Sequence, residues 1–246
     1  MLLNEPTQSP YDLHFSLLKI PVRVHPMFWV MGAILGASGS GDRELRPIFI
    51  WVLAVFVSVL VHEMGHALAI RALGVRPWIT LYGMGGLTSH SGGRFRPAMQ
   101  ILVSLAGPVA GFVLAAIVVA LVKVSGHEIV FYFGWPGLVG WLLLGFSNPA
   151  VEELCHDMLF VNIWWGILNL LPILPLDGGH ITNEVLNICH PRGALQISLW
   201  VSLIVATAMA ATGLTPPLDW FRVLLFGSLA LSSFQMLSAY SGGRRG

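Results

Sequence analysis

Two histidines and a glutamate lie close together in an otherwise apolar stretch, "VHEMGHALAI" (residues 61–70). His62 and His66 are four residues apart, so on a helix they project from one face, one turn apart. This spacing suits two imidazoles that share one tetrahedral zinc ion, with Glu63 beside them as general base. The alternative is a pair of structural histidines bonded to neighbouring helices. Ionisable residues inside a membrane usually mark function, which favours a catalytic metal site.

A zinc ion with two histidine ligands needs a third protein ligand and an open position for water. Asp177 is the best candidate, because it lies in "NLLPILPLDGGH" (169–180), where two prolines break a helix and two glycines free the backbone. A broken helix end at membrane depth is tolerated where it lines a cavity. An Asp that only ends a helix before glycines is the alternative. The His-Glu-x-x-His motif favours the metal ligand.

The composition indicates which class of protein must position these residues. The chain has 246 residues, of which 55% are hydrophobic and only 10% are charged. Soluble domains carry about 25% charged residues, so a multi-pass membrane protein is expected. The formal net charge of +1 suggests no nucleic-acid partner. Cys155 and Cys189 are far apart and predict neither a disulfide framework nor a thiolate zinc site.

Helices that cross a bilayer need about 20 apolar residues. We expect an all-α membrane protein with about six transmembrane helices, in one domain covering residues 1–246, with a core at 22–180 and C-terminal helices at 195–240. The expected spans are 22–37, 47–73, 98–122, 159–176, 195–213 and 218–240. Residues 79–93, after the second span, contain β-branched and aromatic residues around Gly85 and Gly86, which predicts a small β-hairpin or sheet.

A seventh apolar stretch, 129–146, is interrupted by glycines and a proline. If it crossed the membrane, Asp177 would lie on the opposite side from the two histidines. The helices that carry these ligands must run in the same direction, with the single return span 98–122 between them. We therefore expect 129–146 to be re-entrant or interfacial, not spanning.

The two motifs together resemble the site-2 protease family of intramembrane zinc metalloproteases. "HEMGH" (62–66) matches its His-Glu-x-x-His signature, and "NLLPILPLDGG" (169–179) matches its Asn-x-x-Pro-x-x-Pro-Leu-Asp-Gly pattern. "AGPVAG" (106–111) is similar to the Gly-Pro element of the intervening helix, although Gly111 stands where many members carry Asn. The resemblance implies His62, His66 and Asp177 as zinc ligands and Glu63 as catalytic base. It also implies that Asn169 positions or stabilises the reacting carbonyl.

The resemblance implies peptide-bond hydrolysis in or near the transmembrane segment of a single-pass membrane protein, as in regulated intramembrane proteolysis. Zinc would lower the pKa of water toward about 7, and Glu63 would accept the proton. Asn169 could instead make only an interhelical hydrogen bond. The strand edge near Gly85 and Gly86 could hold an extended substrate by β-augmentation, or the segment could be a simple interfacial loop.

A metal-ion transporter, or a metal-binding membrane protein without protease activity, is the competing hypothesis. It gains little from a glutamate beside the first histidine, and the internal repeats expected of many transporters are not visible.

The distribution of basic residues predicts the orientation. With six spans and a cytoplasmic N-terminus, nine basic residues fall inside and four outside. The nine are Lys19, Arg23, Arg71, Arg76, Arg94, Arg96, Arg192, Arg244 and Arg245, and the four are Arg43, Arg46, Lys123 and Arg222. Both termini and the active-site side are therefore expected in the cytoplasm. The oligomeric state is not predicted.

Overall fold

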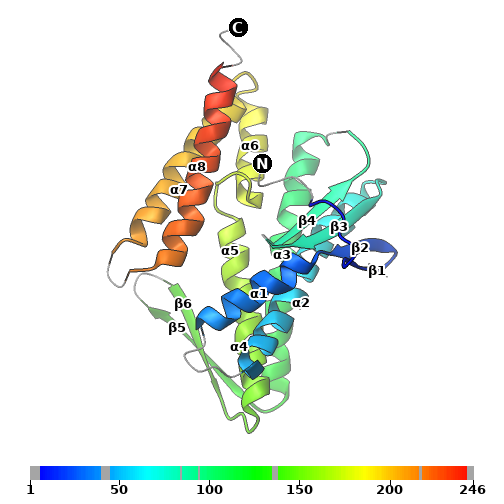
Figure 1. Cartoon of the computed structure of the whole chain (residues 1–246), viewed down its shortest axis with the longest axis vertical. Coiled ribbons are helices and arrows are strands. Elements are labelled where there is room, and N and C mark those ends of the chain that lie inside the picture. Colours follow the sequence, from blue (N-terminus) through cyan, green and yellow to red (C-terminus); the bar gives the residue numbers. More distant parts are fainter. Residues whose placement is uncertain are drawn as a thin grey trace. The chain divides into compact units, whose positions relative to one another are not determined.

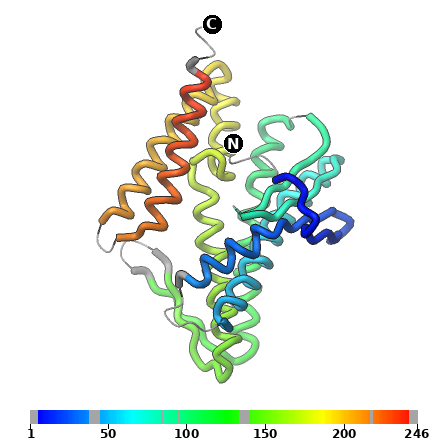
Figure 2. The backbone as a smooth tube through the Cα atoms, in the orientation of Figure 1, coloured from blue at the N-terminus to red at the C-terminus, as the bar shows by residue number. Residues whose placement is uncertain are grey.

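The computed structural model describes residues 6–39, 45–83, 85–93, 95–134, 138–215 and 218–242. Figures 1 and 2 show the course of the backbone, coloured along the sequence. The chain divides into two compact units. The first unit is Met1–Ser91 with Gly107–Gly166, and the second is Gly92–Ala106 with Ile167–Gly246. Arg43, Arg94, Arg244 and Arg245, which were used to predict the orientation, lie outside the described residues.

The first unit contains a four-stranded sheet in the order β1-β2-β3-β4. Its strands are β1 (Leu13–Leu17), β2 (Ile20–Val24), β3 (Pro77–Tyr82) and β4 (Gly85–His90). The pairs β1–β2 and β3–β4 are antiparallel hairpins, whereas β2 and β3 are parallel. Parallel strands need a long crossover connection, and here helices α1 (Pro26–Gly39) and α2 (Leu45–Ala72) supply it.

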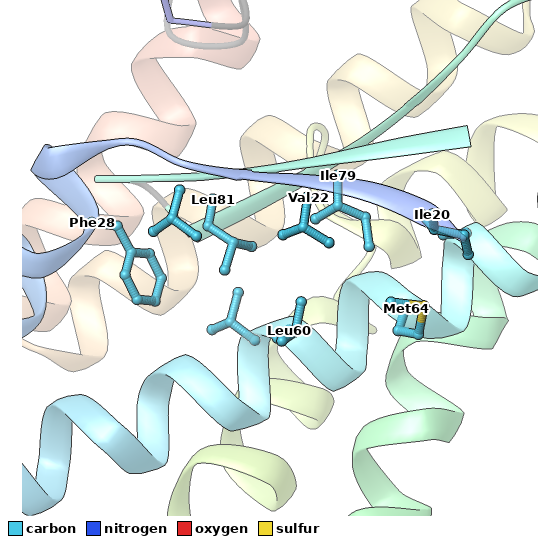
Figure 3. Close-up of a cluster of buried hydrophobic side chains, with 10 residues drawn as sticks. Ile20, Val22, Phe28, Leu60, Met64, Ile79 and Leu81 are labelled. Carbon is cyan, nitrogen blue, oxygen red and sulfur yellow. The ribbon is translucent and has the colours of Figure 1, made fainter. Parts of the chain in front are cut away.

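The sheet packs against α2 through an apolar core, shown in Figure 3. Ile79 and Leu81 alternate with Thr80 along β3 and are fully buried, so they share the same face of the strand. Leu60 and Met64 of α2 belong to the same cluster. This core fixes the sheet to the part of α2 that carries the His-Glu-x-x-His motif.

Helix α3 (Pro97–Val124) leads into a second hairpin, formed by β5 (Glu128–Gly134) and β6 (Leu138–Leu144). Trp141 and Leu143 of β6 lie in one apolar cluster with Val118 of α3 and Leu159 of α4. The stretch 129–146 is therefore an extended hairpin within its described residues and not a membrane-spanning helix. β-Branched and aromatic residues in "IVFYF" (129–133) favour this conformation.

One helical segment runs through three consecutive elements. They are α4 (Pro149–Phe160), a π-helical turn η1 (Val161–Trp165) and α5 (Gly166–Asn169). The expected span 159–176 is wrong in position, because helix continues from Pro149 to Asn169 and is followed by turns. Pro172 and Pro175 fall in those turns, where they cannot continue the helix.

The second unit contains α6 (Asp177–Cys189), α7 (Ala194–Thr212) and α8 (Trp220–Gly242). Helices α7 and α8 lie side by side in both views (Figures 1 and 2) and pack extensively. The turn before α6 contacts this pair, since Ile173 clusters with Ala206 and Phe226.

Four described helices are long and apolar enough to cross a membrane: Leu45–Ala72, Pro97–Val124, Ala194–Thr212 and Trp220–Tyr240. Only 22–33% of their most apolar windows is buried inside the protein, which suits contact with lipid. Pro26–Ala37 is apolar but shorter. The mainly helical membrane fold with a small sheet after α2 is confirmed. The count of about six transmembrane helices is not, and the β-structure is more extensive than predicted.

Candidate metal centre

Helix α2 holds the three residues of the motif within the protein interior. His62, Glu63 and His66 are only 7%, 6% and 8% exposed. The apolar residues before and after them favour a long, uninterrupted helix, and the sheet packs on the same part of it. Burial of three such polar groups is costly unless they bind or pair with something. Their position therefore points to a site and not to a solvated helix face.

The two imidazoles are arranged as they would be around one metal ion. Nε2 of His66 lies 3.2 Å from Nε2 of His62. Two nitrogens bound to a tetrahedral zinc at about 2.0–2.1 Å stand about 3.3 Å apart. A hydrogen bond between the neutral rings would also fit this distance, but the match to the tetrahedral edge means that the pair fits zinc without rearrangement.

Gly107 of α3 leaves the space that a metal ion needs. A Cβ at this position would lie 2.2 Å from Nε2 of His66 and 2.8 Å from Nε2 of His62. These distances approach the length of a zinc–nitrogen bond, so the missing side chain leaves open the volume between the two ligand atoms. Gly107 belongs to the Gly-Pro element of the sequence (106–111). The close approach of its backbone to the two histidines explains why this position has no side chain.

Glu63 is held by strand β4. The Thr88 hydroxyl donates a hydrogen bond of 2.6 Å to Oε2 of Glu63, and Thr88 Oγ1 also lies 3.1 Å from the main-chain carbonyl oxygen of Glu63. Gly86 lies on the same side of the strand, and a Cβ there would meet Cγ of Glu63 at 2.3 Å. The strand backbone therefore approaches the glutamate closely. Gly85 adopts φ of +119°, a backbone conformation that favours glycine.

The pKa of Tyr82 in β3 depends in part on the charge of Glu63. Burial and, secondarily, the nearby Glu63 carboxylate raise the pKa of the Tyr82 phenol above its usual value. The phenol therefore stays neutral over the physiological range and keeps its proton as a donor.

Asp177 is the first residue of α6 in the second unit, and Leu176 precedes it as the extended cap residue. The turn before it is anchored to α7, because Ser202 Oγ accepts a 2.9 Å hydrogen bond from the backbone N–H of Leu174. Gly178 packs so closely that a Cβ would lie 2.1 Å from the carbonyl oxygen of Leu170. The half-buried Asp177 carboxylate is thus fixed at a helix start. Asn169, also in this unit, is buried at the end of α5.

His62 and His66 in the first unit each offer an imidazole nitrogen as a metal ligand, and Asp177 in the second unit offers a carboxylate oxygen. Two imidazole nitrogens and one carboxylate oxygen are a ligand set typical of catalytic zinc. The donor chemistry and the space at Gly107 therefore both fit zinc.

Sequence reasoning missed a polar contact one turn before the histidines. Asn162 Nδ2 donates hydrogen bonds to Ser58 Oγ (2.8 Å) and to the Met158 carbonyl (2.7 Å). Asn162 lies in the π-helical turn η1, and π-turns are frequent at functional sites. Gly111 of α3 lies next to it, and a Cβ there would make only an ordinary contact of 3.5 Å with Asn162 Oδ1. The only signal in the sequence was the four-residue spacing from Ser58 to His62.

Comparison with known proteins places this arrangement in a class. Residues 50–211 match the model of Peptidase family M50. A relative from Synechocystis sp. (strain ATCC 27184 / PCC 6803 / Kazusa) is 29% identical over 181 residues, which is 69% of this chain and 42% of the relative. A protein of Methanocaldococcus jannaschii named zinc metalloprotease is 24% identical over 174 residues, covering 70% of this chain and 44% of that protein. The chain spans less than half the length of these two relatives.

One solved structure matches nearly the whole fold. It is the site-2 protease from Methanocaldococcus jannaschii, with a TM-score of 0.60 and 19% sequence identity, covering 92% of this chain and 95% of that one. The apolar helices, the sheet on α2 and the buried His-Glu-x-x-His motif define an integral membrane protein with a candidate metal centre. The chain belongs to Peptidase family M50, the family of the site-2 proteases.

Proposed function

We propose that the protein is an intramembrane zinc metalloprotease that hydrolyses peptide bonds in or near the transmembrane segment of membrane-protein substrates. The observation that carries the proposal is the buried triplet His62, Glu63 and His66 on an apolar helix, with the two Nε2 atoms at the spacing of zinc ligands. Membership of Peptidase family M50 supports the same activity.

His62, His66 and Asp177 would hold one zinc ion, which when bound polarises the scissile carbonyl and lowers the pKa of water. Glu63 accepts the proton of the attacking water and delivers it to the departing amine. Burial of Glu63 excludes bulk water from this transfer. Asn169 would donate to the developing oxyanion, a contact of a kind worth roughly 3–4 kcal/mol in other hydrolases.

The substrate has to reach Glu63 with its backbone extended, because peptide bonds inside a helix are closed to attack. Strand β4 lies at the edge of the described sheet and touches Glu63 through Gly86. A substrate strand added along Gly85 and Gly86 would be held by main-chain hydrogen bonds next to the catalytic base. The expected substrate is a single-pass membrane protein.

The proposed orientation places both termini and the active-site side in the cytoplasm. It is supported by the excess of basic residues in the segments that would face the cytoplasm. Cleavage on this side would release a cytoplasmic product, as in regulated intramembrane proteolysis.

The test is cleavage in lipid vesicles that contain the purified protein and fluorescently labelled single-pass substrates. The wild type is expected to cleave, and Glu63→Gln is expected to keep its zinc but lose cleavage by several orders of magnitude. Trapped substrates that co-purify with Glu63→Gln are then identified by mass spectrometry. Zinc flux into the vesicles without any cleavage, unaffected by Glu63→Gln, would contradict the proposal and favour a transporter.

A further inference from the structure

Strand β4 meets Glu63 through a specific polar contact as well as through packing. The hydrogen bond from Thr88 Oγ1 to Oε2 is 2.6 Å long. This length is typical of a hydroxyl that donates to an ionised carboxylate, a bond about twice as strong as one between neutral groups. Thr88 has one proton to donate, so the shorter contact takes it. The 3.1 Å approach to the main-chain carbonyl of Glu63 places the hydroxyl beside the root of the same side chain.

The second oxygen of the carboxylate, Oε1, faces the backbone of Gly86. Oε1 of Glu63 lies where a Cβ on Gly86 would approach it to 2.5 Å. Gly86 and Thr88 are two residues apart on one strand and therefore share a face. Thr88 thus donates a hydrogen bond to Oε2, and Gly86, which has no side chain, leaves room for Oε1. Together they fix the rotation of the carboxylate about its last bond.

We propose that Thr88 is a positioning residue for Glu63, and that through it strand β4 sets the orientation of the catalytic base. This inference rests on the proposed protease function. Thr88 acts through Glu63 and leaves Oε1 as the oxygen that receives the proton.

The experiment compares Thr88→Val with Thr88→Ser. Valine keeps the branched shape that strands favour but removes the hydroxyl, whereas serine restores it. Ser89→Ala is the matched control, because Ser89 neighbours Thr88 on the strand and points to the opposite face. Each variant is purified with zinc, its zinc content is measured, and kcat and KM are determined in vesicles.

Thr88→Val is expected to lower kcat roughly 10- to 100-fold, the range seen when a residue that orients a catalytic group is lost. KM should change by less than about twofold, since the contact matters for reaction and not for binding. Zinc content should equal that of the wild type. Thr88→Ser should recover most of the lost kcat, and Ser89→Ala should behave as wild type.

An infrared readout separates this inference from the proposed function. The carboxylate band of Glu63 is found from the wild-type minus Glu63→Gln difference spectrum at fixed pH. It should shift in Thr88→Val and stay in place in Thr88→Ser and Ser89→Ala, even if no substrate is ever cleaved. An unshifted band, a wild-type kcat in Thr88→Val, or an equal loss of kcat in the serine variant would overturn the role of Thr88. Absence of cleavage in the wild type would instead contradict the protease.

Discussion

At the residue scale, the site depends as much on missing side chains as on ligands. His62 and His66 present their nitrogens to a space that Gly107 leaves open, and Glu63 lies in a space that Gly86 leaves open. The ligand spacing could be predicted from sequence, because four residues make one helical turn. The glycines could not be assigned to particular neighbours, since nothing in the sequence says which helix or strand approaches α2.

Gly107→Ala tests whether this space holds the metal ion. The added Cβ would stand 2.2 Å from Nε2 of His66, so one imidazole must move or the metal must leave. We expect zinc affinity to fall at least about tenfold, as measured by competition with a chromogenic chelator. Gly227→Ala on α8 is the control, because an added Cβ there would point into open space. Unchanged zinc affinity in Gly107→Ala would place the metal elsewhere.

At the element scale, α2 and the sheet form the frame that brings the base and strand β4 together. The hairpin after α2 could be predicted from its β-branched residues around two glycines. Strands β1 and β2 could not, because each has only five residues. Moreover, β2 pairs with β3, which lies more than 50 residues further along the chain. The residues preceding α1 therefore looked like an apolar entry to a helix. The role of Thr88 could not be predicted for the same reason, because it depends on how the sheet packs against α2.

Leu81→Ala tests this frame. Leu81 of β3 is fully buried where the strand packs against α2. Its truncation leaves a cavity that should lower the free energy of unfolding by about 2–5 kcal/mol. We expect a lower midpoint of thermal unfolding in detergent, together with reduced cleavage, since β4 pairs with β3. Leu13→Ala on the exposed face of β1, where the side chain is 51% exposed, should change stability little. Equal stability of the two variants would show that the sheet is not fixed by this core.

At the scale of the whole molecule, the low charge content and four long apolar helices make the bilayer part of the structure. The membrane class could be predicted from composition alone. The number of spans could not, because apolar residues in the turns after α5 resemble those of a spanning helix. Prolines and glycines, not hydropathy, distinguish these segments.

Reporter fusions test the proposed orientation. A phosphatase inserted at Gly126, in the turn between α3 and β5, is expected to be active outside the cytoplasm. A fluorescent protein at the C-terminus should fold and fluoresce inside, since basic residues favour the cytoplasmic side. A phosphatase that is active at the C-terminus would reverse the orientation and place the active-site side outside.

The central claim is that two imidazoles of α2 and the carboxylate of Asp177 bind one zinc ion, and zinc content per chain tests it most directly. Purified protein is dialysed against a weak chelator and its zinc is measured by mass spectrometry. We predict about one zinc ion per chain in the wild type and in Glu63→Gln, and nearly complete loss in His62→Ala and Asp177→Ala. Full zinc content in Asp177→Ala, with the protein folded, would contradict the account.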